Sequence, residues 1–134
     1  MSYSMTHDAD DTFIWTFVGW IDSEEFRRWY ADARQMTVNS SLPTLYQVMD
    51  VTQADTDFGA ILGQMREVGK APFYAIDQRT INFLFVGTSE MAKLAANLAR
   101  QPQFGGFTMP MFRTMEDAQE FIRLDRLKRV NITE

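Results

Sequence analysis

The sequence predicts a single α/β domain with a mostly parallel sheet. Apolar segments of strand length alternate with segments of helical periodicity, in the order β-β-α-β-α-β-α-β-α. Such alternation requires crossover connections, which join parallel strands. The chain has 134 residues, 46% of them hydrophobic, which suits one domain with one core. We therefore expect residues 1–134 to form one domain with a mixed sheet of four to five strands and four helices.

Segments rich in β-branched and aromatic residues predict the strands. They are Tyr3–Thr6, Thr12–Ile21, Leu45–Val51, Thr80–Val86 and Phe107–Phe112. The first two form a predicted hairpin, which adds one antiparallel strand. Both faces of the second segment are apolar, so we expect a central strand covered on both sides. Pro110 favours the edge of the sheet for the last segment. Residues 73–79 are ambiguous between a short strand and an irregular connection.

Four segments carry apolar residues at helical spacing. Their apolar positions are Phe26, Trp29, Tyr30 and Ala33; Phe58, Ile61, Leu62, Met65 and Val68; Met91, Leu94, Ala95 and Leu98; and Ala118, Phe121, Ile122 and Leu127. Asp22, followed three residues later by Glu25, predicts a capped start of the first helix. Ser89 and Thr114 stand where caps of the third and fourth helices are expected.

Charge and composition exclude several classes of function. The net charge is −5, and residues 1–60 hold ten acids against three bases, which disfavours nucleic acid as a partner. A basic group ends the last predicted helix, where we expect a solvated surface: Arg123, Arg126, Lys128 and Arg129. The absence of cysteine excludes disulfides and thiol catalysis. The one histidine, His7, is expected to be a surface residue.

The residues also offer no catalytic constellation. No GxGxxG is present, and no Walker lysine follows the Gly87-Thr88-Ser89 turn. The aspartates at positions 50, 55 and 57 lack the Gly and terminal Glu of an EF-hand loop, so solvated turn acids are expected. We therefore expect no enzymatic activity, no cofactor and no metal. The apolar run Phe13–Ile21 is too short to span a membrane, and we expect a cytoplasmic protein.

Three passages carry a family resemblance. They are Gly19-Trp-Ile-Asp-Ser-Glu-Glu-Phe26, Val48–Met65 and Phe112-Arg-Thr-Met-Glu-Asp-Ala-Gln-Glu-Phe-Ile122. Together they resemble the SpoIIAA-like superfamily, which includes the STAS domains and the CRAL–TRIO-like lipid binders. The resemblance covers nearly the whole chain, and small STAS-like bacterial proteins match it best. It implies a SpoIIAA-like fold and a non-enzymatic regulatory or protein-interaction module.

The resemblance also implies a site at the start of the second helix. In bacterial anti-sigma-factor antagonists, a kinase phosphorylates a serine there. Matching Gly59-Ala-Ile-Leu-Gly63 to the corresponding helix places Thr56 at the phosphorylated position, as a phospho-acceptor. Asp55 and Asp57 stand where that motif has Ser and Gly. The alternative is that Asp55 or Thr56 caps the helix.

Two kinds of partner follow. A protein partner, which the sequence does not identify, is expected at a surface formed by Asp50, Asp55, Asp57 and Phe58. The alternative is a carrier of a small apolar or lipid-like ligand in a CRAL–TRIO-like pocket. Its lining would be drawn from Trp15, Trp20, Trp29, Phe58, Met65, Phe83 and Phe85, which otherwise form plain core. An open edge near Pro110 is a candidate surface for a homodimer.

Overall fold

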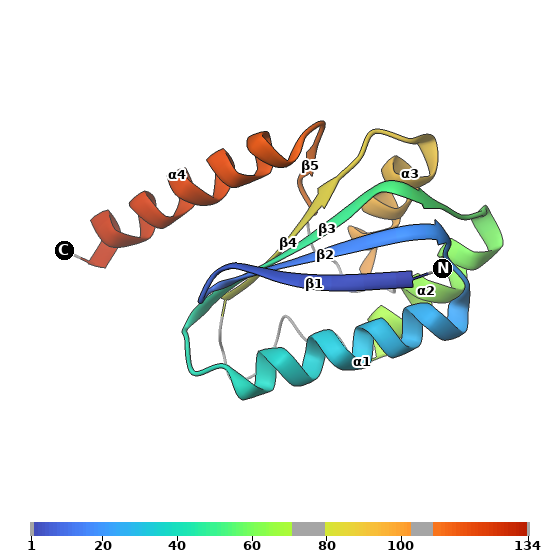
Figure 1. Ribbon diagram of the computed structural model, residues 1–134, viewed down its shortest axis with the longest axis horizontal. Coiled ribbons are helices and arrows are strands. Elements are labelled where there is room, and N and C mark those ends of the chain that lie inside the picture. Colours follow the sequence, from blue (N-terminus) through green and yellow to red (C-terminus); the bar gives the residue numbers. More distant parts are fainter. Residues whose placement is uncertain (1, 71–79, 103–108, 134) are drawn as a thin grey trace.

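A five-stranded mixed sheet lies at the centre of the computed structural model, which describes residues 2–70, 80–102 and 109–133 (Figure 1). The side chains at positions 2, 58, 65, 67–70 and 131–133 are not among those described. The strands lie side by side in chain order: β1 (Ser2–Ala9), β2 (Thr12–Trp20), β3 (Thr44–Asp55), β4 (Thr80–Val86) and β5 (Met111–Phe112). β1 pairs antiparallel with β2, and each later neighbour pairs in parallel. This confirms the predicted hairpin and the mostly parallel sheet. Residues 73–79, and positions 107 and 108 of the last predicted strand, lie outside the described residues.

Helices cover both faces of the sheet in the described ranges. They are α1 (Ser23–Asn39), α2 (Phe58–Lys70), α3 (Glu90–Ala99) and α4 (Met115–Thr133). Phe26, Ile61 and Ala95 share one core cluster, so α1, α2 and α3 lie on the same face. Right-handed crossovers between successive strands of one sheet produce this arrangement. α4 packs on the opposite face, and its outer end extends beyond the sheet (Figure 1).

The core beneath α1 is aromatic and contains a buried polar chain. Trp15 and Trp29 meet edge to face, with ring centroids 6.0 Å apart. The Trp15 indole donates to Gln47 Oε1 over 2.6 Å, and Gln47 Nε2 donates to Thr37 Oγ1 over 3.2 Å. Because the side chain of Gln47 is fully buried, these bonds replace the water that both ends of its amide would otherwise bind.

The second face of β2 is only partly covered. Ile14 packs at the margin of the α4 core, but Val18 is 43% exposed. The prediction that both sides of this strand are covered is therefore wrong. The reason is that α4 packs against β3, β4 and β5 rather than over the far end of β2.

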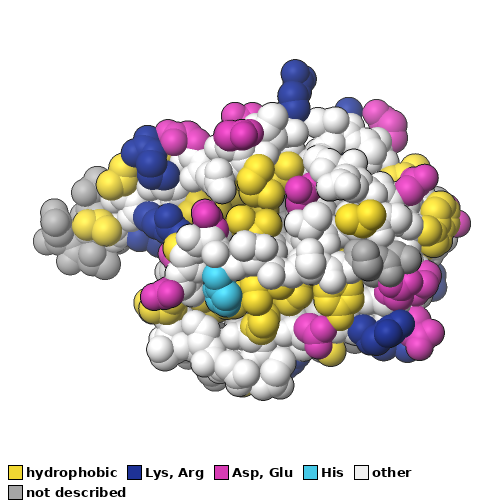
Figure 2. All heavy atoms as spheres, viewed as in Figure 1, with side chains coloured by type: hydrophobic (Ala, Val, Ile, Leu, Met, Phe, Trp, Pro, Cys, Tyr) yellow, Lys and Arg dark blue, Asp and Glu magenta, His cyan; other side chains and the backbone are white. Residues whose placement is uncertain are grey.

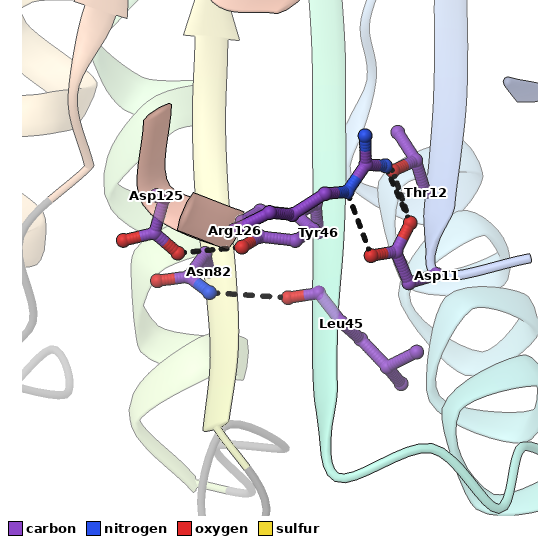
Figure 3. Close-up of polar contacts among 7 residues, drawn as sticks. All are labelled: Asp11, Thr12, Leu45, Tyr46, Asn82, Asp125 and Arg126. Atoms are coloured by element: carbon purple, nitrogen blue, oxygen red, sulfur yellow. Dashed lines mark hydrogen bonds and ion pairs between the residues drawn. The ribbon is translucent and has the colours of Figure 1, made fainter. Parts of the chain in front are cut away.

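A polar network fixes the outer half of α4 to the sheet (Figure 3). Arg126 donates two hydrogen bonds to the carboxylate of Asp11, from Nε to Oδ2 at 3.0 Å and from Nη2 to Oδ1 at 2.6 Å. Arg126 Nη2 also donates to the Thr12 hydroxyl over 2.8 Å. The Tyr46 hydroxyl donates to Asp125 over 2.5 Å. Burial, together with that bond, raises the pKa of Tyr46 to about 12, so the hydroxyl stays a donor.

This network corrects two predictions about α4. Arg126 and Arg129 are half-buried and bind Asp11 and Asp125, so they are not simply solvated. Figure 2 shows the Lys and Arg side chains gathered over the outer part of this helix. Leu127, expected on the inner side, is 50% exposed. The inner side carries polar groups there because the helix has passed beyond the apolar part of the sheet.

The helix starts confirm the predicted caps. The side chains of Asp22, Ser89 and Thr114 accept from the backbone N–H of Glu25, Ala92 and Asp117. His7 is exposed and contacts the Phe13 ring, as expected for a surface residue. Within the described ranges, no helix is both long and apolar enough to cross a membrane.

Candidate functional site

The candidate site lies where the carboxyl ends of the parallel strands meet the start of α2. β3 extends to Asp55, four residues beyond the predicted end at Val51. The extension pairs with the end of β2, where Trp20 stands opposite Asp55. The next backbone N–H, from Ile21, donates to the Asp55 carbonyl over 2.8 Å. The extra ladder therefore holds the start of α2 against the end of β2.

Asp57, rather than Asp55 or Thr56, caps α2. Its Oδ1 accepts from the N–H of Ala60 over 2.8 Å, and its carbonyl accepts from the N–H of Ile61 over 3.0 Å. Asp55 belongs to the strand, and its side chain accepts from the N–H of Thr56 over 2.8 Å. The prediction that Asp55 or Thr56 caps the helix is therefore wrong. The cap falls one or two residues later, because β3 continues through the segment predicted to be a turn.

Thr56 lies between these two aspartates and is half-buried. Its hydroxyl donates to the Ile21 carbonyl over 3.2 Å. A phosphate on this oxygen would remove that bond and place two or nearly two negative charges beside two exposed carboxylates. This hydrogen bond therefore joins the start of α2 to the residue that follows β2.

Asp50 is separated from the other predicted members of the surface. It precedes Asp55 by five positions on β3, roughly 16 Å along an extended strand. Its carboxylate accepts locally, from the N–H and hydroxyl of Thr52. Side-chain alternation places it on the α4 face with Tyr46 and Val48. The structure therefore brings Asp55, Thr56 and Asp57 together, and leaves Asp50 apart. The side chain of Phe58 lies outside the described residues.

An exposed tryptophan is the feature that the sequence did not reveal. Trp20 is 48% exposed, whereas Trp15 and Trp29 are 2% exposed. Gly19, directly before it in β2, has a φ of +89° but keeps its pairing with Ala54 of β3. Where β2 ends, Figure 2 shows hydrophobic and acidic side chains next to each other on the surface. The glycine is the one sequence signal for an unusual backbone conformation next to Trp20, because the left-handed region favours glycine.

Those residues proposed for a lipid-like pocket whose side chains the structure describes do not enclose one space. Trp15, Trp29 and Phe83 pack within the main core, and Trp20 lies at the surface. Phe85 lines a cavity of about 60 Å³ between α2 and α3. Met65 and Phe58 have side chains outside the described set. Within the described residues, no three His, Asp or Glu side chains cluster closely enough to hold a metal ion.

Comparison with known proteins identifies the fold. No protein-family model and no curated protein matches the chain. A solved DUF3478 protein with a SpoIIAA-like fold, from Shewanella loihica PV-4, superposes with a TM-score of 0.57 and 16% identity, over 90% of this chain and 91% of that one. The anti-sigma factor antagonist SpoIIAA in its unphosphorylated form gives 0.55 and 15%, over 91% and 96%.

The Bacillus cell fate determinant SpoIIAA in its phosphorylated form gives a TM-score of 0.54 and 14% identity, over 90% of this chain and 99% of that one. At such identities the likeness concerns the fold alone. The chain has the SpoIIAA-like fold, which confirms the predicted fold class.

Proposed function

We propose that this protein is a non-enzymatic STAS-like regulatory module that binds another protein through the surface at the end of β2 and the start of α2. We call this surface the β2–α2 surface; it comprises Trp20, Asp55, Thr56 and Asp57. The half-exposed Trp20 is the observation that carries the proposal. Tryptophan is enriched among the residues that dominate binding energy at protein interfaces, and exposing it without a partner leaves a large apolar area in water.

The charge of this surface indicates what kind of partner protein would bind to it. Asp55 and Asp57 are exposed, and Asp55 stands opposite Trp20 in the ladder between β2 and β3. Their oxygens accept from backbone N–H groups within the chain, which leaves each carboxylate further lone pairs facing solvent. The complementary partner presents an apolar pocket for Trp20, rimmed by Arg or Lys.

Thr56 supplies the regulatory step of this proposal. Phosphorylation would add negative charge next to two carboxylates and break the hydrogen bond to Ile21, so we expect it to weaken partner binding. SpoIIAA, which has the same fold, has been solved in a phosphorylated form, and this supports the proposal that a protein of this fold is phosphorylated. Thr56→Ala should prevent the modification, and Thr56→Glu should mimic its effect on binding. Equal partner affinity for the wild type, Thr56→Ala and Thr56→Glu would refute the switch.

The binding proposal is tested by quantitative affinity capture from cells that express the protein. The bait variants are the wild type, Trp20→Ala and Val38→Ala, since Val38 is equally exposed at 48% but lies on α1 away from the β2–α2 surface. We expect a protein retained equally by the wild type and Val38→Ala, and reduced about tenfold or more by Trp20→Ala. Equal retention by all three baits, or no retained protein above the Trp20→Ala level, would contradict the proposal.

Native mass spectrometry of the same material measures the phosphorylation state and the oligomeric state of the protein. A mass increment of one phosphate, mapped to Thr56, supports the switch, and a bare mass in cells containing the partner argues against it. The same spectrum reports whether the chain forms a homodimer. Neither measurement depends on the variant Trp20→Ala.

A further inference from the structure

A small cavity separates the first turns of α2 and α3 from the carboxyl end of the sheet. Its volume is about 60 Å³, and it opens beside Asp55 and Thr56. Ile61, Phe85 and Ala95 give it apolar walls. By the measure in which one water needs roughly 10–15 Å³, this volume holds about four to six water-sized groups. That is far too little for a lipid chain but enough for a small organic molecule.

One wall of the cavity carries an unpaired polar group. Gln64 lines the cavity and is 6% exposed, and its Nε2 has no hydrogen-bond partner within the described residues. An unpaired buried donor costs roughly 1–3 kcal/mol, so native proteins seldom keep one without a reason. The other buried glutamine, Gln47, shows the usual arrangement, because both ends of its amide are bonded. Gln64 therefore marks a place where an acceptor is missing.

We propose that this cavity binds a small uncharged amphipathic molecule, whose oxygen accepts a hydrogen bond from Gln64 and whose apolar part lies against Ile61, Phe85 and Ala95. The side chains that line the cavity indicate that the ligand is uncharged. None of the described residues that line the cavity is Lys, Arg or His, and the exposed Asp55 is among them, so an anion is disfavoured. A cation is disfavoured inside because the unpaired group of Gln64 is itself a donor.

This inference does not rest on the proposed protein partner. The cavity shares Asp55 and Thr56 with the β2–α2 surface, but it is tested by direct binding to the purified chain. Failure of one proposal therefore leaves the other standing.

The test is a two-dimensional ¹H–¹⁵N NMR titration of the full chain with propanamide, which has a carbonyl oxygen, a short apolar end and no charge. We expect saturable shifts of the Gln64 side-chain NH₂ and of backbone signals around the cavity, with weaker binding of propionate. Gln64→Met preserves length but removes the donor, and should weaken propanamide binding about tenfold. Gln53→Met is the matched control, because Gln53 is exposed on β3 and does not line the cavity.

A second variant keeps the test independent of any change at Gln64. Ala95→Leu adds bulk to the cavity wall and should abolish the shifts, while its spectrum reports whether the fold is retained. Three results would overturn the inference: equal propanamide affinity for the wild type and Gln64→Met, shifts that are scattered and do not saturate, or propionate binding as tightly as propanamide.

Discussion

Replacement of Arg126 by alanine should detach the outer half of α4 from the sheet at a measurable cost. The side chain of Arg126 is 40% exposed and that of Asp11 is 23% exposed, so their ion pair is screened and contributes at most about 1 kcal/mol. The bond to the buried Thr12 hydroxyl contributes about 1 kcal/mol. The guanidinium also lies 5.6 Å from the Tyr46 ring centroid, which contributes roughly 0.5–1 kcal/mol.

Together these interactions predict that Arg126→Ala lowers the free energy of unfolding by about 2–3 kcal/mol. Urea unfolding followed by tryptophan fluorescence measures it. Arg126→Lys keeps the charge but not the two-pronged geometry, and should fall between the wild type and Arg126→Ala. Arg123→Ala is the control on the same helix. Arg123 is exposed and forms an ion pair with the exposed Glu120 three residues earlier, so we expect no measurable change in stability.

A double-mutant cycle with Asp11→Asn isolates the ion pair. If the geometry is correct, the two substitutions should be less than additive by roughly 0.5–1 kcal/mol. Full additivity, or an Arg126→Ala protein within about 0.5 kcal/mol of the wild type, would refute the reasoning.

Two further predictions follow from the same structure. Gly87→Ala should destabilise the fold by about 1–3 kcal/mol, because the new Cβ would lie 2.9 Å from Val51 Cγ2 and the residue has a φ of +154°. Thermal unfolding compares it with Gly59→Ala, whose Cβ meets nothing closer than 3.6 Å and which should be neutral or stabilising; equal melting temperatures for the two variants would contradict this reading. Burial acts to raise the pKa of Asp11, but the bonds and charge of Arg126 outweigh it and hold that pKa below the ordinary 3.8. The ionised carboxylate therefore stabilises the fold above about pH 4–5, and this contribution is lost as the pH falls through the lowered folded pKa. Accordingly, the gap in unfolding free energy between the wild type and Asp11→Asn should be constant near neutral pH and close in acid, and a gap that widens in acid would contradict it.

The local features of this chain were determined by its sequence alone. Asp22, Ser89 and Thr114 cap helices that begin where the pattern predicts, because a cap needs only a side-chain oxygen and an N–H three residues away. The alternation of strands and helices likewise fixed the order of elements and the mostly parallel sheet, since crossover connections allow few other arrangements.

The sequence also located the Thr56 segment, although not its detailed geometry. Its position between β3 and α2 agrees with the prediction, but the cap fell on Asp57 because β3 continued to Asp55. Strand length depends on whether a neighbour offers a ladder, and here the end of β2 offers one. A single-chain pattern does not contain that information.

Only the tertiary structure decided which apolar and charged residues are covered. Alternation assigns Trp15 to one face of its strand, but it does not show that Trp20, at the end of β2, would be exposed or that Leu127 would face solvent. Asp11 and Arg126 are 115 positions apart, and no sequence pattern in either segment predicts their ion pair. In the sequence, Gln64 is an ordinary polar residue of a helix. Only the structure shows that it is buried and lines the cavity between α2 and α3. Periodicity is a property of one element, whereas burial is a property of its neighbours, and for this reason the sequence predicted the fold and the structure supplied the sites.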